Sequence, residues 1–118
     1  MTATILLAHG SRDPLWRLSV DLVRTRMVLM MPDHLVRCAF LEFCSPDLGT
    51  ALSEMVALGA TSITVMPMFM GMGRHVRLEL PRLAGQLKRQ FSDVELIFKP
   101  PIGESPEMID LLARMALS

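Results

Sequence analysis

Four apolar, β-like runs alternate with four helical patterns along the chain, and this alternation constrains the fold most. The predicted strands cover residues 4–8, 35–41, 62–67 and 94–99, and the predicted helices cover residues 14–30, 46–58, 76–90 and 106–117. Two of the strands are nearly continuous apolar runs, which indicates burial on both faces. Alternating strands and helices with short connections predict a parallel sheet with right-handed crossovers. We expect a three-layer α/β/α fold, flavodoxin-like, with four strands in the order 2-1-3-4.

Apolar side chains at helical spacing give the second, third and fourth helices an inward stripe. These stripes are Leu48, Leu52, Met55 and Val56; Val76, Leu80, Leu83 and Leu87; and Met108, Leu111, Leu112 and Met115.

Capping residues mark the predicted helix ends. Asp13, Ser45 and Ser105 each precede a proline, so we expect each to cap a helix start. Gly59 is the expected C-cap of the second helix. Pro81 predicts that the third helix starts near residue 78 or is kinked.

Composition excludes several classes of protein. A chain of 118 residues that is 51% hydrophobic fits one domain with a real core. Its formal net charge of zero does not predict nucleic-acid binding. No apolar run reaches the ~18 residues of a membrane span, and the N-terminus has no signal-peptide pattern, so we expect a cytoplasmic protein.

The two cysteines are not expected to form a disulfide. An extended segment from Cys38 to Cys44 would separate them by ~20 Å, whereas a disulfide needs Cα atoms within ~7 Å. Cys44 is either a small packing residue or a soft metal ligand.

Two histidine motifs follow predicted strands. His9 lies in the segment 6–14, Leu-Leu-Ala-His-Gly-Ser-Arg-Asp-Pro, where Gly10 permits a positive φ or a close backbone approach. His75 lies in the glycine- and arginine-rich segment 67–77 after the third strand. A lone histidine of this kind is often only a hydrogen-bonded turn residue. Two histidines at the carboxyl edge of one sheet instead indicate a divalent metal site or proton transfer, because open α/β proteins bind ligands at that edge.

The loop that carries His75 also suggests an anionic ligand, because arginine binds carboxylates and phosphates with paired hydrogen bonds. The alternative is a flexible loop with a solvated basic turn. Neither Gly-x-Gly-x-x-Gly nor the Walker pattern is present, so a nucleotide site is not expected.

Three further polar residues lie near the predicted strand ends. Glu42, at the crevice end of the second strand, is a proton acceptor, a metal ligand or a solvated strand end. Glu104 precedes the fourth helix and is a weaker candidate for the crevice. His34 lies in a helix–strand turn at the opposite end of the sheet, where we expect a surface position.

Methionines alternate from residue 66 to residue 72, and the chain has 11 in all. This pattern has three interpretations: core packing, an adaptable wall for a large planar ligand, or a soft-metal site.

Taken together, three segments resemble a known family. They are residues 9–14 (His-Gly-Ser-Arg-Asp-Pro), residues 39–42 (Ala-Phe-Leu-Glu), and residues 67–77 (Pro-x-Phe-x-x-x-Gly-x-His-Val-Arg). The chain resembles the short form of the CbiX-type sirohydrochlorin chelatases, which are class II chelatases, over nearly its whole length. The resemblance implies one chelatase-like α/β domain over residues 1–118, equivalent to half of the two-lobed long form, and a homodimer.

The resemblance also implies an activity and a site. The activity is insertion of Co²⁺ into sirohydrochlorin for cobalamin synthesis, with Fe²⁺ insertion for siroheme as the alternative and Ni²⁺ as a further metal. By analogy, His9 and His75 handle the metal and Glu42 assists catalysis, without an organic cofactor. The residues expected to bind the tetrapyrrole are Ser11, Arg12, Met70, Gly73, Arg74 and Arg77.

The sequence departs from the family pattern at Ser105, where relatives often have a histidine before the proline of the last helix. This departure motivates one alternative, a metal or tetrapyrrole carrier without catalysis. The half length of the chain motivates another, a regulatory or partner subunit that pairs with a different half.

Overall fold

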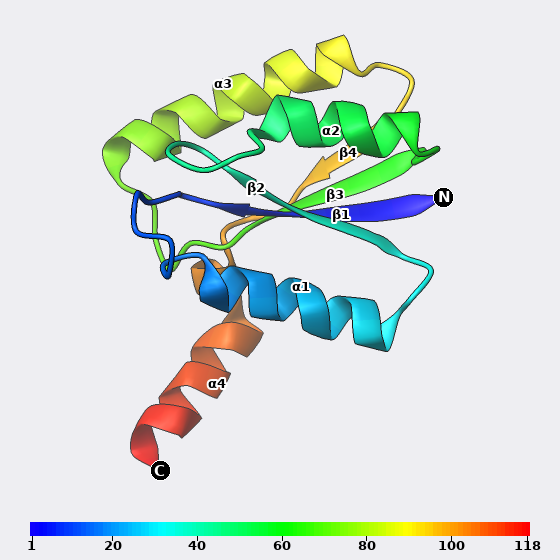
Figure 1. Cartoon of the computed structure of the whole chain (residues 1–118). Coiled ribbons are helices and arrows are strands. Elements are labelled where there is room, and N and C mark those ends of the chain that lie inside the picture. The colour runs from blue at the N-terminus through cyan, green and yellow to red at the C-terminus, as the bar shows by residue number, and fades with distance from the viewer.

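The computed structural model describes residues 1–118 as a parallel sheet between two layers of helices. The elements in chain order are β1 (Thr2–Ala8), α1 (Leu18–Met30), β2 (Leu35–Phe40), α2 (Leu48–Ala57), β3 (Ser62–Pro67), α3 (Arg74–Gln90), β4 (Glu95–Phe98), the 3₁₀ helix η1 (Ile102–Glu104) and α4 (Pro106–Leu117). Helices α2 and α3 cover one face of the sheet, and α1 and α4 lie on the other (Figure 1). The three-layer prediction is confirmed, and the predicted strand boundaries agree within two residues.

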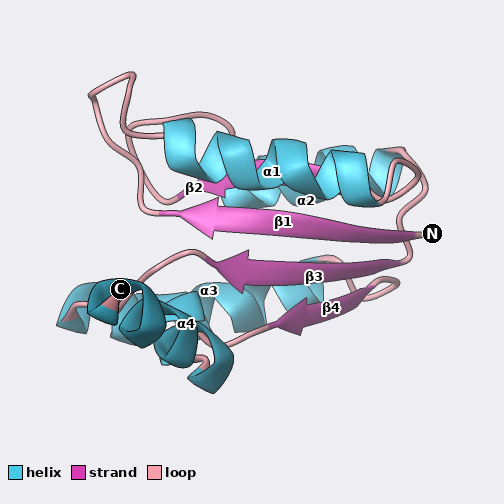
Figure 2. Ribbon diagram, turned by 90° about the horizontal axis from the view of Figure 1, so that it is seen from below, coloured by secondary structure: helices cyan, strands magenta, loops and turns pink.

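The strand order is β2-β1-β3-β4, which confirms the predicted order 2-1-3-4. All three pairings are parallel, and Leu6 of β1 lies opposite Cys38 of β2 and Met66 of β3. The strands therefore point the same way (Figure 2), and their carboxyl ends meet at one edge. The segments that follow β1, β2 and β3 converge at this edge.

The larger part of the hydrophobic core lies on the α2 and α3 side. Ile5 and Leu7 point to that side, and Leu6 and Ala8 belong to the smaller cluster beneath α1, so β1 is buried on both faces as predicted. The stripes of α2 and α3 are also confirmed. Their fully or nearly fully buried members are Leu48, Leu52, Met55, Leu80 and Leu87, and Val56, Val76 and Leu83 pack against them.

The helices on the other face bury much less. In α1 only Val20 is buried, and in α4 no residue is buried. The prediction of an inward stripe on α4 is therefore wrong, since Leu111 is 45% exposed and Met115 is 66% exposed. Helix α4 extends away from the sheet (Figure 1), so its apolar side chains have little of the chain to cover them.

Only one of the three expected caps before proline is confirmed. Ser105 accepts a hydrogen bond from the Met108 amide and starts α4. Asp13 instead accepts from the Leu15 amide (2.9 Å) within a turn, and α1 starts four residues later than predicted.

The start of α2 differs in a similar way. The peptide bond between Ser45 and Pro46 is cis, and Asp47 is the N-cap, with its side chain accepting from the Thr50 amide at 2.8 Å. The predicted cap at Ser45 is wrong, because the carboxylate two residues later reaches the free amide. The end of α2 agrees with the prediction, since Gly59 follows it at φ 100°.

Helix α3 begins at Arg74, so the prediction of a start near residue 78 is wrong. The Arg77 amide donates to the Gly73 carbonyl at 3.0 Å, which closes the first turn before Pro81 is reached. Pro81 lies inside a helix that continues to Gln90.

The remaining features are the cysteines, the third histidine and the lengths of the helices. Both cysteines are free, as expected. His34 is half-buried, rather than simply on the surface as expected, because its ring hydrogen-bonds to Thr2 (3.2 Å) and Thr4 (2.7 Å). None of the helices has the length and hydropathy needed to cross a bilayer.

Candidate functional site

A histidine and a carboxylate from neighbouring strands form the centre of the site. His9 follows the last residue of β1, and its Nε2 lies 2.9 Å from Oε1 of Glu42, just beyond β2. The two side chains are 49% and 50% exposed. An ionised carboxylate only accepts hydrogen bonds, so Nε2 of His9 donates and Nδ1 of the neutral ring keeps its lone pair.

Backbone contacts hold this pair in place. The amides of Leu41 and Glu42 both donate to the His9 carbonyl, at 3.2 and 3.0 Å. Gly10 has φ 105°, and a Cβ at this position would overlap the Glu42 carbonyl oxygen. Only glycine therefore allows the two loops to approach this closely.

His75 comes from the third segment that reaches the edge. Gly73 is the N-cap of α3, which places His75 in the first helical turn with an exposed side chain. Upstream, the loop is anchored by the buried Phe69, whose carbonyl accepts from the Gly103 amide at 2.9 Å. The loop before α3 is thus fixed at both ends, and the helix directs His75 toward the sheet edge.

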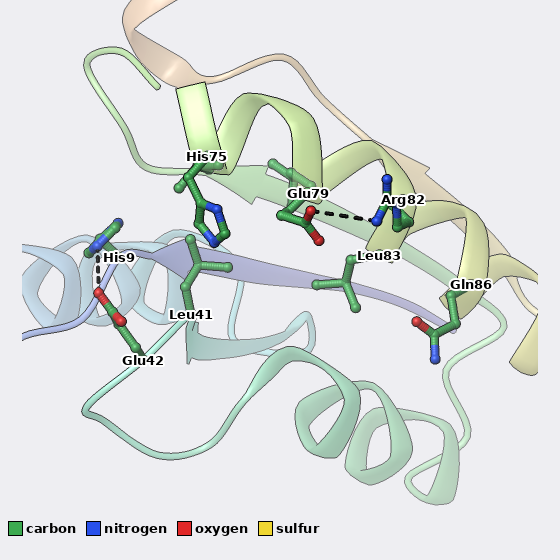
Figure 3. A pocket seen from close by; sticks show the side chains of 10 residues that line it. His9, Leu41, Glu42, His75, Glu79, Arg82, Leu83 and Gln86 are labelled. Carbon is green, nitrogen blue, oxygen red and sulfur yellow. Dashed lines mark hydrogen bonds and ion pairs between the residues drawn. The ribbon is translucent and has the colours of Figure 1, made fainter. Parts of the chain in front are cut away.

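The three predicted catalytic side chains line two cavities that meet at the edge. The first, of about 330 Å³, runs from His9 and Glu42 past His75 along α3 (Figure 3). The second, of about 360 Å³, is lined by the same three residues together with the loop that contains Gly73. Volumes of this order fall in the range of small-molecule sites.

Of the six residues predicted to bind the tetrapyrrole, Gly73 lines the second cavity and the other five lie outside both cavities. Ser11 accepts from the Asp13 amide at 3.1 Å, and the Arg12 guanidinium lies 4.7 Å from the centre of the Phe43 ring. The side chains that the two cavities leave out are Ser11, Arg12, Met70, Arg74 and Arg77, of which Met70 is 67% exposed. Glu104 is exposed in η1 and lines neither cavity.

Most residues of the first cavity were not among those predicted from the sequence. Its additional lining residues are Leu41, Val76, Glu79, Leu80, Arg82, Leu83 and Gln86. Six of them lie on α3. Four of these six, Val76, Glu79, Arg82 and Leu83, are three or four residues from His75 or Glu79, so the helical period that predicted the apolar stripe also places them on one face.

The structure brings together no group of three or more His, Cys, Asp or Glu side chains that could hold a metal ion. Cys44 donates from its thiol to the Ser11 carbonyl at 3.2 Å, which fits a packing residue. The alternating methionines divide between layers: Met66 and Met68 pack under α1, Met72 packs toward α2 and α3, and Met70 is exposed.

Fold and site together define an open α/β protein with two imidazoles and a carboxylate at the carboxyl edge of its sheet. The CbiX family profile matches residues 3–117, and the chain belongs to the CbiX family. The resemblance inferred from the motifs is thereby confirmed.

Known proteins similar to this chain agree with that family. A protein named sirohydrochlorin cobaltochelatase from Saccharolobus islandicus is 32% identical, with 97% of this chain and 92% of that protein covered. One of the same name from Methanopyrus kandleri is 24% identical, with 95% and 92% covered. The crystal structure of a CbiX protein from Marinobacter aquaeolei VT8 matches with a TM-score of 0.82 at 28% identity, over 99% of this chain and 94% of that one.

A longer solved structure shares the fold. The sirohydrochlorin chelatase SirB from Bacillus subtilis subspecies spizizenii, solved in complex with cobalt, matches with a TM-score of 0.78 at 22% identity. The match covers 98% of this chain but 50% of that one, so this chain corresponds in length to about half of SirB.

Proposed function

We propose that this protein is a sirohydrochlorin cobaltochelatase, a lyase that inserts Co²⁺ into the tetrapyrrole for cobalamin biosynthesis. The observation that carries the proposal is the convergence of His9, Glu42 and His75 on shared cavities at the carboxyl edge of the sheet. Family membership and the cobaltochelatases that are 32% identical support it.

The His9–Glu42 pair suits the proton chemistry of insertion. Two pyrrole N–H protons must leave the macrocycle as the metal enters. Glu42 orients the His9 ring by accepting from Nε2, which leaves Nδ1 free to bind the metal or to accept a proton. A neutral imidazole keeps a lone pair on one ring nitrogen, so it can take up a proton and release it again in each cycle.

His75 supplies the second imidazole. It reaches the cavities from α3, opposite the His9–Glu42 pair, and imidazole is a good ligand for Co²⁺, Fe²⁺ and Ni²⁺. We assign to His75 the role of metal ligand. Co²⁺ is the proposed substrate, and no organic cofactor takes part.

The periphery of the site suits a macrocycle with many carboxylates. Arg12, Arg74 and Arg77 are exposed, and arginine binds carboxylates with paired hydrogen bonds. We assign these three residues to the acidic side chains of sirohydrochlorin. We further assign substrate contacts to Ser11 and Gly73, and a contact with the ring face to Met70.

We also propose that the protein works in the cytoplasm as a homodimer, each chain contributing one lobe. Helix α4 supports a second copy of the chain as the partner, because it carries apolar side chains that its own chain leaves 45–88% exposed. The half-length match to SirB supports the same assembly. Native mass spectrometry should give twice the mass of the chain, and a stable monomer would favour pairing with a different half-length protein.

The test of activity is an absorbance time course of sirohydrochlorin with Co²⁺ and a catalytic amount of protein. We expect many turnovers, and at least a hundredfold loss of rate in His9→Ala and His75→Ala. His34→Ala is the matched control, because this third histidine lies at the other end of the sheet.

Full activity in the His9→Ala/His75→Ala double variant would refute the proposal. A single stoichiometric insertion without turnover would identify a carrier instead. Faster insertion of Fe²⁺ than of Co²⁺ would reassign the protein to siroheme synthesis.

A further inference from the structure

The first cavity continues past the predicted catalytic residues along one face of α3. Glu79 lies four residues after His75, and both side chains line this cavity. Figure 3 shows them projecting from successive turns of α3 on the side that faces Leu41. Neither a sequence motif nor the family resemblance points to Glu79, so its role is inferred from its position in the cavity.

The spacing of His75 and Glu79 suits joint binding of one cation. Side chains four residues apart on a helix have Cβ atoms about 6 Å apart, and paired ligands at this spacing hold metals in other helices. Imidazole and carboxylate are both ligands for divalent first-row metals. A cation between them would lie in the same cavity as the His9–Glu42 pair.

We propose that His75 and Glu79 form a loading site, where a divalent cation such as Co²⁺ binds before it moves to the His9–Glu42 pair. The inference rests on the proposed function, because it takes Co²⁺ to be the substrate. A site with two protein ligands leaves the other coordination positions to water. Such a cation is held weakly, as a metal that must be passed on requires.

The neighbour of Glu79 supports this assignment. Nη1 of Arg82 lies 3.7 Å from Oε1 of Glu79, and the side chains are 78% and 49% exposed. An ion pair this long and this exposed contributes little to stability. The carboxylate is therefore available to a cation, and Arg82 acts as a competitor for it.

This competition gives a test that separates a metal ligand from a structural ion pair. Glu79→Gln and Arg82→Gln break the same ion pair, so a structural role predicts the same direction of change for both. A loading site predicts opposite directions: weaker Co²⁺ binding in Glu79→Gln and tighter binding in Arg82→Gln.

The measurement is calorimetric titration of full-length protein with Co²⁺ alone, in a His9→Ala background that removes the inner site. We expect Kd to rise about tenfold in Glu79→Gln and to fall about threefold in Arg82→Gln. Glu107→Gln, an exposed residue of α4, is the control and should leave Kd unchanged. Unchanged Kd in Glu79→Gln, or changes in the same direction for Glu79→Gln and Arg82→Gln, would overturn the inference.

Turnover separates this inference from the proposed function. In otherwise wild-type protein, Glu79→Gln should raise KM for Co²⁺ without changing KM for sirohydrochlorin. If the wild-type protein turns over and Glu79→Gln changes neither the KM for Co²⁺ nor the KM for sirohydrochlorin, only the loading site is refuted. A protein that shows the opposite shifts in Kd but never inserts metal would refute the proposed function and leave the cation site in place.

Discussion

Replacing Gly10 with alanine should damage both the stability of the protein and its site. Two separate costs arise at this position. The backbone has φ 105°, which L-residues rarely adopt, and a Cβ would overlap the carbonyl oxygen of Glu42. Since that overlap is with backbone rather than with a flexible side chain, the β1–α1 loop and the segment around Glu42 must move apart.

The magnitude follows from these two costs. A positive φ costs a residue with a Cβ about 1–2 kcal/mol, and forcing an atom into a packed contact costs about 1–3 kcal/mol. The free energy of unfolding should therefore fall by about 2–5 kcal/mol. With an unfolding entropy of about 2.1 cal/mol/K per residue, each 1 kcal/mol lost from the free energy of unfolding lowers Tm by about 4 °C in this 118-residue chain. Tm should therefore fall by about 8–20 °C.

Gly59→Ala is the matched control, and differential scanning calorimetry is the assay. Gly59 has φ 100° but no atom within 4 Å of an added Cβ, so its substitution carries only the backbone cost, about 4–8 °C. Chelatase activity should fall in Gly10→Ala at temperatures where it remains folded, because the 2.9 Å contact between His9 and Glu42 is disturbed. Equal losses of Tm in the two variants, or full activity in Gly10→Ala, would refute the steric argument.

Three further predictions concern the core and two titratable groups. Leu52→Ala, at a fully buried position, should cost about 2–5 kcal/mol in urea unfolding. Asp47→Ala should lower the free energy of unfolding by about 1 kcal/mol near pH 7. The hydrogen bond from Thr50 lowers the pKa of Asp47, so the difference between the variant and the wild type should disappear as pH falls through that lowered pKa. Burial raises the pKa of Cys38 to about 11, so iodoacetamide at pH 8 should label Cys44 much faster than Cys38, and the two should react alike after denaturation. Because the folded state raises this pKa, the contribution of the protonated Cys38 to stability is complete below about pH 9 and is lost as pH rises through about 11.

Sequence predicted the sheet well because the signals are local and strong. The apolar run at Ile5 reflects burial on both faces, whereas the run at Ile63 is fully buried on one face and only half-buried on the other. Helices between strands enforce parallel crossovers, which leave few possible strand orders. Both motif histidines were also found, because each directly follows a strand or begins a helix that the pattern defines.

Prediction was less successful where several local solutions compete. Asp13 can cap either a turn or a helix, and it caps a turn. Both Ser45 and Asp47 can cap α2, and the loop path selects Asp47. The sequence correctly predicts an apolar stripe on α4, but the helical spacing of residues does not reveal whether another part of the same chain covers that stripe.

The sequence by itself determined the order of strands and helices, the family, and the two histidine motifs, because each depends on neighbouring residues and their spacing. Tertiary structure alone decided that Glu42 pairs with His9, 33 positions away, and that Glu79 faces the same cavity. These arrangements follow from which strands lie side by side and which face of α3 points toward the sheet edge. Helical spacing places Glu79 on the same face of α3 as His75, but the packing of the whole chain decides that this face points toward the sheet edge.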